Sequence, residues 1–449
     1  MAESQKTYAL ILGKNPALSV AEAANHLQAR GIEHELLAYS HWEPAQHRGK
    51  QQRLYVDSPT PAASGFLVFR SARAPALDHL GGSLKLLEAL AIQPTNHPLR
   101  KLSAAFAPLT DAFPHDKKHS IAVSGYGSDP KAIRNALAHL LVNSLQGEEI
   151  PFSLLPQKEP AISHTDLLAK RVLESSLELS LLEARASNGQ ETRWLCRTLS
   201  AHDPHSHRLR DTGRPKQRAI YSIPPRLAKV LLNLACAAPE KTVLDPFCGV
   251  GAIVQEAALL GCKALGTDRS APIIADCKEN LAWLATRYKL AHGPAVRVGY
   301  ANKLPFPDNS IDAIATESDM GPPLKHRPNP AVAKKIVKSL AAMYTAFLCE
   351  GLRVLRPGCR MALVTPRFLG RKWDLGIDVP ALAQRFGGRR LDPIPALVPH
   401  SLPLLDFTER HRTIREISVV EKLPGKHVNI GRYQKVPRDF NEYQERFKP

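Results

Sequence analysis

Residues 242–251 read Thr242-Val-Leu-Asp245-Pro246-Phe247-Cys248-Gly249-Val-Gly251, an apolar run that ends in a carboxylate and is followed by two glycines. The apolar residues predict a buried strand, and Ala252 to Leu260 predict a helix that begins at the glycine turn. Because glycine has no Cβ, Gly249 and Gly251 allow a ligand to approach the backbone. The order of strand, glycine turn and helix is typical of a nucleotide-type ligand site.

A second carboxylate supports this interpretation. The run Ala264-Leu-Gly-Thr predicts another strand that ends at Asp268, 23 residues after Asp245. At about this spacing an acid binds ribose hydroxyls in nucleotide-binding βαβ units. A dinucleotide fold would have a third glycine where Val254 stands, and Asp245 would repel a pyrophosphate but attract an ammonium group. S-adenosylmethionine carries an ammonium, a sulfonium and a ribose, so we expect it as the cofactor. The simpler alternative is a βα turn without a ligand.

The same stretch resembles the first motif of the class I methyltransferases, in the branch that THUMP-domain RNA methyltransferases share with DNA amino-methyltransferases. Four further runs resemble tRNA guanosine-N2 methyltransferases that act at position ten. They are Arg210-Asp211-Thr-Gly-Arg214-Pro215, Ile223-Pro224-Pro225-Arg226-Leu227-Ala228, Leu355-Arg356-Pro357-Gly358-Cys359-Arg360 and Arg412-Thr-Ile-Arg415-Glu416-Ile417. The resemblance spans nearly the whole chain. It implies an enzyme that transfers a methyl group to the exocyclic N2 of a guanosine in tRNA at position 10.

The fold expected is α/β: a Rossmann-like, doubly wound and mostly parallel methyltransferase sheet, preceded by a ferredoxin-like domain and a THUMP-like α+β domain. Strands alternating with helices after Asp268, including Ile311 to Glu317, favour the parallel sheet. The amino-terminal run Ile11 to Ser19 is similar to the ferredoxin-like domain of the family. There we expect a helix that a capping box opens at Ser19 and another over Leu84 to Ala91. The expected boundaries are 1–95, 96–190, a basic linker at 191–222, the methyltransferase domain at 223–425 and a basic-aromatic tail at 426–449.

Composition restricts the class of protein. The 449 residues are 44% hydrophobic and carry a net charge of +18, which favours two or three globular domains and polyanionic partners. The seven cysteines follow position 195, and none forms a Cys-x-x-Cys pair, so no metal site is expected. No apolar run reaches the roughly 18 residues of a membrane span, and the first residues do not resemble a signal peptide, so we expect a cytoplasmic protein without a membrane partner.

Residues 191–218 contain seven Lys or Arg and three acids, together with three histidines that we expect on the surface. Pro204, Gly213 and Pro215 predict irregular backbone. Such a segment is suited to follow RNA phosphates, although a solvated linker has the same composition. The candidate RNA-binding residues are Arg208, Arg210, Arg214, Lys216 and Arg218.

The resemblance also implies roles for individual residues. After the fourth strand the family carries Asp-Pro-Pro-Tyr-Gly, whose acid and backbone carbonyl hold the amino group while the ring stacks on the base. Here the residues are Glu317-Ser318-Asp319-Met320-Gly321, which implies that Glu317, Asp319 and Met320 are catalytic. The cofactor contacts that we expect, with Tyr300 and Ala301 in place of the family's adenine-binding acid, are Asp245, Pro246, Phe247, Gly249, Gly251, Asp268, Tyr300 and Ala301.

Two other functions compete with tRNA methylation. A DNA amino-methyltransferase shares the first motif, but it predicts an aromatic catalytic motif and leaves the first 190 residues without a purpose. A non-catalytic RNA-binding protein could keep the fold as a scaffold. Cys248 lies on the cofactor loop, so we expect no nucleophilic role for it. The sequence does not reveal whether a small activating protein partner is needed.

Overall fold

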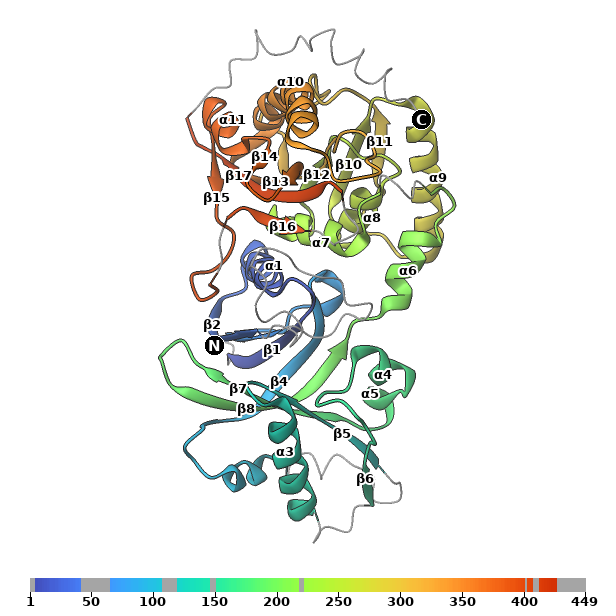
Figure 1. The fold of residues 1–449 in the computed structure, drawn as a ribbon. Coiled ribbons are helices and arrows are strands. Elements are labelled where there is room, and N and C mark those ends of the chain that lie inside the picture. The colour runs from blue at the N-terminus through green and yellow to red at the C-terminus, as the bar shows by residue number, and fades with distance from the viewer. Residues whose placement is uncertain are drawn as a thin grey trace.

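The computed structural model describes residues 5–41, 65–106, 119–145, 151–217, 222–399, 402–406 and 412–425. Arg218 and the basic-aromatic tail at 426–449 lie outside these ranges. Two lobes are stacked on each other, with the amino-terminal half of the chain below and the carboxy-terminal half above (Figure 1). No helix in the described ranges has the length and apolar character that crossing a membrane requires.

The lower lobe is built on one sheet, which has eight strands among the described residues, in the order β2-β3-β1-β4-β8-β7-β5-β6. The strands that come first in the chain lie at one end of the sheet and β5, β6 and β7 at the other, while the central β4 and β8 pair with each other. The strands are β1 (Lys6–Leu12), β2 (His34–His41), β3 (Gly65–Ser71), β4 (Ser83–Pro94), β5 (His119–Tyr126), β6 (Phe152–Leu154), β7 (Glu178–Arg185) and β8 (Glu191–Ala201).

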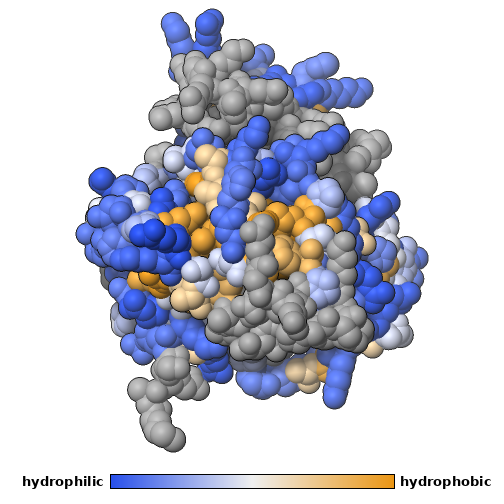
Figure 2. All heavy atoms as spheres, turned by 90° about the horizontal axis from the view of Figure 1, so that it is seen from below, coloured by the Kyte–Doolittle hydropathy of each residue, from blue (hydrophilic) through white to orange (hydrophobic). Residues whose placement is uncertain are grey.

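Short helices and turns surround this sheet. They are α1 (Pro16–Ala29), α3 (Pro130–Leu145), α4 (His164–Ala169), α5 (Val172–Ser175) and the 3-10 turns η2 (Leu77–His79) and η3 (Leu99–Ala105). Helix α3 covers β5 and β7 with its buried leucines. Seen from below, this lobe shows a central group of apolar side chains with hydrophilic side chains around it (Figure 2).

Two local predictions for this lobe are wrong. Leu84 to Ala91 belong to β4 rather than to a helix, because pairing with β1 and β8 outweighs their helix propensity. The capping box at Ser19 does not form either. Helix α1 begins at Pro16, and the Asn15 side chain accepts the hydrogen bond from the Leu18 N–H at 3.2 Å.

The prediction of an irregular basic linker over 191–222 is wrong for Glu191–Thr212. Residues 191–201 form the central strand β8 of the lower sheet, and α6 (Pro204–Thr212) follows directly, with the Asp203 side chain as its cap. The prediction of surface histidines is wrong for His202 and His207. Their rings lie 4.3 Å apart in the interior, where burial lowers the pKa of His202 to about 2 and that of His207 to about 3.

The upper lobe confirms the predicted fold class. Its main strands lie in the order β11-β10-β9-β12-β13-β17-β15, and β9 to β13 run parallel where they pair. The strands are β9 (Thr242–Asp245), β10 (Lys263–Asp268), β11 (Ala295–Val298), β12 (Ile311–Glu317), β13 (Leu355–Leu369), β14 (Asp374–Gly376), β15 (Gly388–Leu391), β16 (Leu404–Asp406) and β17 (Ile414–Lys422).

Helices lie on both faces of this sheet. Helices α7 and α8 share one apolar core with the lower lobe, while α10 and α11 belong to a second core on the other side of the sheet. Carboxyl ends of parallel strands meet at one edge, which therefore carries the site. The helices are α7 (Pro225–Leu234), α8 (Ala252–Leu259), α9 (Ala271–Arg287), α10 (Pro330–Val354) and α11 (Val379–Arg385).

The two lobes share their interior. Helix α1 of the lower lobe packs on α7 of the upper lobe, and apolar residues of both contribute to one continuous core. The buried Glu22 carboxylate accepts hydrogen bonds from the Gly81 and Gly82 N–H groups at 2.6 and 2.7 Å and from the Asn233 amide at 2.9 Å. Apolar packing and satisfied polar groups together fix the lower lobe against the upper one.

Candidate active site

Asp245 ends β9 and is buried, and its two carboxylate oxygens have different environments. Oδ1 accepts hydrogen bonds from the Thr316 hydroxyl at 2.7 Å and from the Phe247 N–H at 3.1 Å. No described residue donates a hydrogen bond to Oδ2. The carboxylate is therefore fixed in orientation while one oxygen stays available to a ligand.

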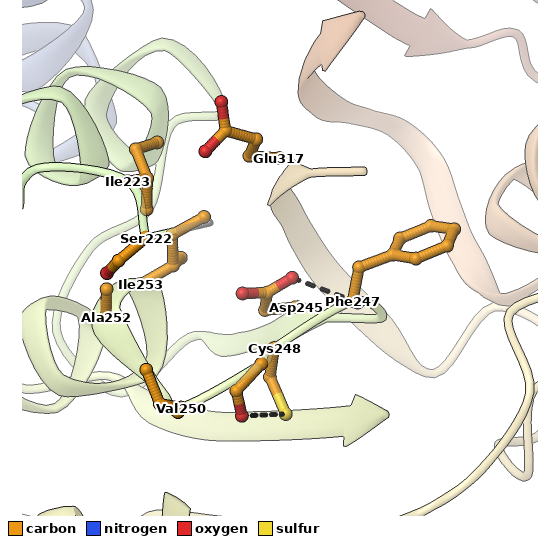
Figure 3. Close-up of a pocket in the computed structure, with 10 residues that line it drawn as sticks. Ser222, Ile223, Asp245, Phe247, Cys248, Val250, Ala252, Ile253 and Glu317 are labelled. Carbon is orange, nitrogen blue, oxygen red and sulfur yellow. Dashed lines mark hydrogen bonds between the residues drawn. The ribbon is translucent and has the colours of Figure 1, made fainter. Parts of the chain in front are cut away.

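A small pocket opens to solvent beside this carboxylate. Asp245 and Glu317 project into it from the ends of the neighbouring strands β9 and β12, whereas the Phe247 ring extends away from Ser222 and Ile253 (Figure 3). That ring packs edge-on against Phe347 at 5.0 Å. The residues that line the pocket are Ser222, Ile223, Asp245, Phe247, Cys248, Gly249, Val250, Ala252, Ile253 and Glu317.

Glycine is needed at the two positions of the turn for different structural reasons. Gly249 has φ +50°, and a Cβ there would meet no atom within 4 Å, so the backbone is open toward the pocket. Gly251 has φ +94°, and a Cβ would lie 2.6 Å from the Cys277 sulfur. Gly249 thus provides access, and Gly251 allows α8 to begin tightly against α9.

Asp268 lies directly behind the turn. Its Oδ2 accepts the Gly249 N–H at 3.2 Å and its Oδ1 accepts the Ser270 N–H at 2.9 Å. The Gly299 N–H donates to the Asp268 carbonyl at 3.0 Å, which brings the loop after β11 to the same edge. Tyr300 on that loop is 59% exposed. Asp268 thus contacts the glycine turn, and Tyr300 follows a residue that is bonded to Asp268, although neither lines the pocket itself.

The pKa of Asp245 is raised to about 7, chiefly by burial and in addition by the nearby Asp268 and Glu317 carboxylates, against the lowering effect of the hydrogen bonds from Thr316 and Phe247. Without a cation beside it, this carboxyl group is therefore partly protonated at neutral pH. A ligand ammonium would favour the ionised form.

Glu317 is held by an ion pair from the last long strand. Arg415 of β17 donates from Nε to Glu317 Oε1 at 2.6 Å and from Nη2 to Oε2 at 3.5 Å. Both side chains are largely buried, at 17% and 10% exposure for Arg415 and Glu317. One oxygen of Glu317 is firmly bound and the other has only a long contact.

The backbone after Glu317 is fixed by hydrogen bonds in place of the two prolines of the resembling motif. The Tyr344 hydroxyl of α10 donates to the Asp319 carbonyl at 2.9 Å and accepts from the Ser318 hydroxyl at 2.7 Å. The Asp319 side chain accepts the Gly321 N–H at 2.8 Å. A buried tyrosine therefore ties this loop to α10.

The structure brings some of the predicted site residues together and leaves others apart. Asp245, Phe247, Gly249 and Glu317 line one pocket. The others do not line it. Pro246 is buried and its carbonyl accepts from Thr267, Ala301 packs on the core beside α10, and Met320 packs on the core shared by the lobes. Gly251, Asp268, Tyr300 and Asp319 lie on the loops around the pocket.

Sequence reasoning did not find four residues that shape the site, namely Ser222, Thr316, Tyr344 and Arg415. Ser222 and Thr316 precede motif residues that the sequence analysis singled out, so their position in the chain was a signal. Tyr344 and Arg415 lie 25 and 98 residues from their partners, and nothing in the local sequence links them to the pocket.

The Cys248 thiol lines the pocket but is not suited to act as a nucleophile. A hydrogen bond with Cys277 and burial both raise its pKa, so it stays protonated. A thiol rather than a thiolate is a poor nucleophile.

Two of the residues predicted to bind RNA are buried in the structure. Arg210 is buried and donates from Nε to Glu256 at 2.6 Å, and Arg214 is also buried and donates to the Ser222 hydroxyl. Both therefore stabilise the interior near the pocket. Arg208 is exposed, and Lys216 is partly exposed and pairs with Glu279 at 3.3 Å.

A mostly parallel sheet, a glycine turn after its first strand and acids at three strand ends define the class I methyltransferase fold. Residues 215–368 match the family described as the RMKL-like methyltransferase domain. Residues 215–368 of the upper lobe are therefore similar to this methyltransferase domain.

Several characterised proteins are similar to parts of the chain. A tRNA (guanine(10)-N2)-dimethyltransferase of Pyrococcus abyssi is 36% identical over 109 residues, which are 24% of this chain and 31% of the relative. A tRNA (guanine(6)-N2)-methyltransferase of Thermus thermophilus is 36% identical over 159 residues, or 34% and 42% of the two chains. The chain thus spans less than half the length of these relatives. The crystal structure of TrmN from Thermus thermophilus aligns with 94% of this chain and all of its own, at 18% identity and a TM-score of 0.41.

Proposed function

We propose that this protein transfers a methyl group from S-adenosylmethionine to the exocyclic N2 of a guanosine in tRNA, at position 10. The observation that supports the proposal is the pair of carboxylates in one pocket. Asp245 at the end of β9 has an open oxygen, and Glu317 lies at the end of the adjacent strand β12. The names of the relatives, which act on tRNA guanine N2, support the substrate.

The residues present fit the methyl donor. Asp245 Oδ2 is the acceptor for the ammonium group, and Asp268 at the end of β10 binds the ribose hydroxyls. Val250 and Ile253 provide apolar contact in the pocket, and the exposed Tyr300 ring can cover the adenine. When bound, the donor supplies a methyl group on a sulfonium, which a nitrogen lone pair can attack in line.

Positioning of the target amino group provides most of the rate enhancement. Arg415 holds Oε1 of Glu317, so Oε2 faces the amino group as an acceptor and aligns its lone pair. The Ser318 carbonyl, on the loop that Tyr344 fixes, is the second acceptor. After transfer the nitrogen carries an extra proton, which leaves to Glu317 Oε2.

We infer that the lower lobe recognises tRNA, with residues 1–95 as a ferredoxin-like part and residues 96–190 as a THUMP-like part. Arg208, exposed on α6 between the lobes, and Lys216 remain candidates for contact with tRNA phosphates.

The test is transfer of labelled methyl from S-adenosylmethionine to unmodified tRNA transcripts, followed by mapping of the labelled nucleoside. N2-methylguanosine at position 10 is the expected product, and a transcript with adenosine at that position is the matched control. Label on duplex DNA alone would instead indicate a DNA amino-methyltransferase.

One observation favours a second candidate, a non-catalytic RNA-binding protein. The Pro-Pro-aromatic part of the resembling motif is absent, and Glu317 is engaged by Arg415. Calorimetric binding of the donor without turnover on any tRNA would support this candidate against the first.

A further inference from the structure

The stretch that follows the pocket is strongly and uniformly basic. From Pro322 to Cys349 the chain has five Lys or Arg and no Asp or Glu. These are Lys325 and Arg327 in the loop after β12, and Lys334, Lys335 and Lys338 in the first part of α10. All five are exposed, and none of them has an ion-pair partner among the described residues.

The five cations share one side of the molecule. In α10 the side chains of Ala333, Ile336 and Leu340 face the core, so Lys334, Lys335 and Lys338 form one solvent-facing stripe at helical spacing. Helix α10 lies at the top of the upper lobe, on the far side from the lower lobe (Figure 1). We call these five residues the α10 surface.

The α10 surface adjoins the candidate active site. Its loop follows Glu317 directly, and hydrogen bonds of Tyr344 and Asp319 fix the first residues of this loop, up to Gly321. The Arg412 side chain donates to the Lys325 carbonyl at 3.5 Å, three residues before the Arg415 that binds Glu317. The short segment 412–415 thus contacts both the loop of the α10 surface and the pocket residue Glu317.

The charges are unfavourable for the free protein. Three lysines in the first nine residues of α10 repel one another and lie at the end of the helix where acids are preferred. Two acids on or beside the neighbouring elements β14 and α11 are engaged elsewhere, Asp374 with Arg367 and Asp378 as the cap of α11. A bound polyanion would relieve this repulsion.

We propose that the α10 surface binds the phosphate backbone of the RNA substrate beside the target nucleotide. The proposal depends on the proposed function for the identity of the polyanion. It places the RNA across the methyltransferase domain itself, in addition to any contact with the lower lobe. Three phosphates neutralised by three lysines would make binding steeply dependent on salt.

The test compares two triple variants of the full-length protein with the same loss of charge. One is Lys334→Gln, Lys335→Gln, Lys338→Gln. The matched control is Lys241→Gln, Lys278→Gln, Lys289→Gln, at exposed positions before β9 and on and after α9. Affinity for an unmodified tRNA transcript is measured from about 50 to 200 mM salt, and donor affinity is measured in parallel.

We expect the α10 variant to bind the transcript at least about tenfold more weakly, with a salt slope smaller by about two to three, while donor affinity is unchanged. Its melting temperature should rise, which separates lost binding from misfolding. Equal losses in both triple variants, or no loss in either, would overturn the proposal. An equal loss for duplex DNA of the same length would overturn its assignment to RNA. If the transcript binds through α10 but receives no methyl group, the surface stands and the proposed function fails.

Discussion

Asp245 combines a cost to stability with a proposed role in donor binding. In Asp245→Asn, the amide oxygen can keep both hydrogen bonds of Oδ1, from Thr316 and Phe247, while an NH₂ group replaces the open oxygen. The ammonium of S-adenosylmethionine would then face an NH₂ group, which cannot accept a hydrogen bond from it. We therefore expect the affinity for S-adenosylmethionine to fall at least about 100-fold, which corresponds to about 2.7 kcal/mol. Isothermal calorimetry with S-adenosylmethionine measures this loss, and unchanged affinity would contradict the assigned role.

The same substitution should stabilise the fold. The pKa of Asp245 rises from 3.8 to about 7 on folding, so the folded state binds the proton more tightly and stability is lost as pH rises from 3.8 to about 7. The ceiling of this loss is about 4 kcal/mol. Denaturation of Asp245→Asn and the parent at pH 8 should show a gain for the variant that disappears near pH 4.

Donor binding should depend on pH through this one carboxyl group. Below about pH 7 the carboxyl group must lose its proton before it can pair with an ammonium, so the dissociation constant should rise toward tenfold per pH unit. Near pH 7 the binding should release protons, detectable in buffers of different ionisation enthalpy. Asp245→Asn is the control, and a pH-independent affinity of the parent between pH 5 and 7 would contradict the prediction.

Tyr344 is expected to act as a positioning residue. Tyr344→Phe removes the donor to the Asp319 carbonyl and the acceptor for Ser318, so the loop beside the proposed base site loses its attachment to α10. We expect kcat for tRNA methylation to fall about 10- to 100-fold with donor affinity unchanged. Tyr126→Phe in the lower lobe removes another buried hydroxyl and is the matched control. A merely structural role would give both variants the same loss.

Residues of the site could be predicted where each directly follows a strand that the local sequence reveals. Asp245, Gly249 and Glu317 follow apolar strand patterns directly, so local spacing placed them at one sheet edge. Arg415 comes from a strand that pairs antiparallel with β13, and only the completed sheet brings it to Glu317. The burial of Arg210 and Arg214 could not be predicted, because it depends on helix packing and the local sequence is charged.

At the scale of elements, the parallel strands of the upper lobe were predictable and the central strands of the lower lobe were not. Strands β9 and β12 are mostly buried, and both contain short apolar runs, Val243-Leu244 in β9 and Ala313-Ile314-Ala315 in β12. Strand β4 contains Lys85 and Glu88, which a local pattern assigns to the polar face of a helix. In the sheet, Lys85 pairs with Glu178 at 2.6 Å and Glu88 with Arg197 at 2.7 Å. Partners from distant strands thus outweighed local propensity.

At the scale of the whole molecule, the core that α1 and α7 share couples the two lobes. Asn233 of α7 bonds to Glu22 at 2.9 Å, to the His79 carbonyl at 2.8 Å and to the His26 ring at 2.9 Å, all within the interior. Burial raises the pKa of Glu22, which shows how closely this carboxylate is enclosed. Separation of the lobes would expose apolar surface and break these bonds together, so we expect the lobes to unfold as one unit.

This coupling predicts that a ligand of the upper lobe protects the lower lobe. Saturating S-adenosylmethionine binds the folded state alone, and at 100-fold excess over its dissociation constant stabilises that state by about 2.7 kcal/mol. Because the lobes unfold together, hydrogen exchange in β7 and β8, around the buried Trp194, should slow as much as exchange in β9 and β12. Asn233→Ala weakens the junction and should restrict the protection to the upper lobe. Protection confined to the upper lobe in the parent protein would show that the shared core does not couple the lobes.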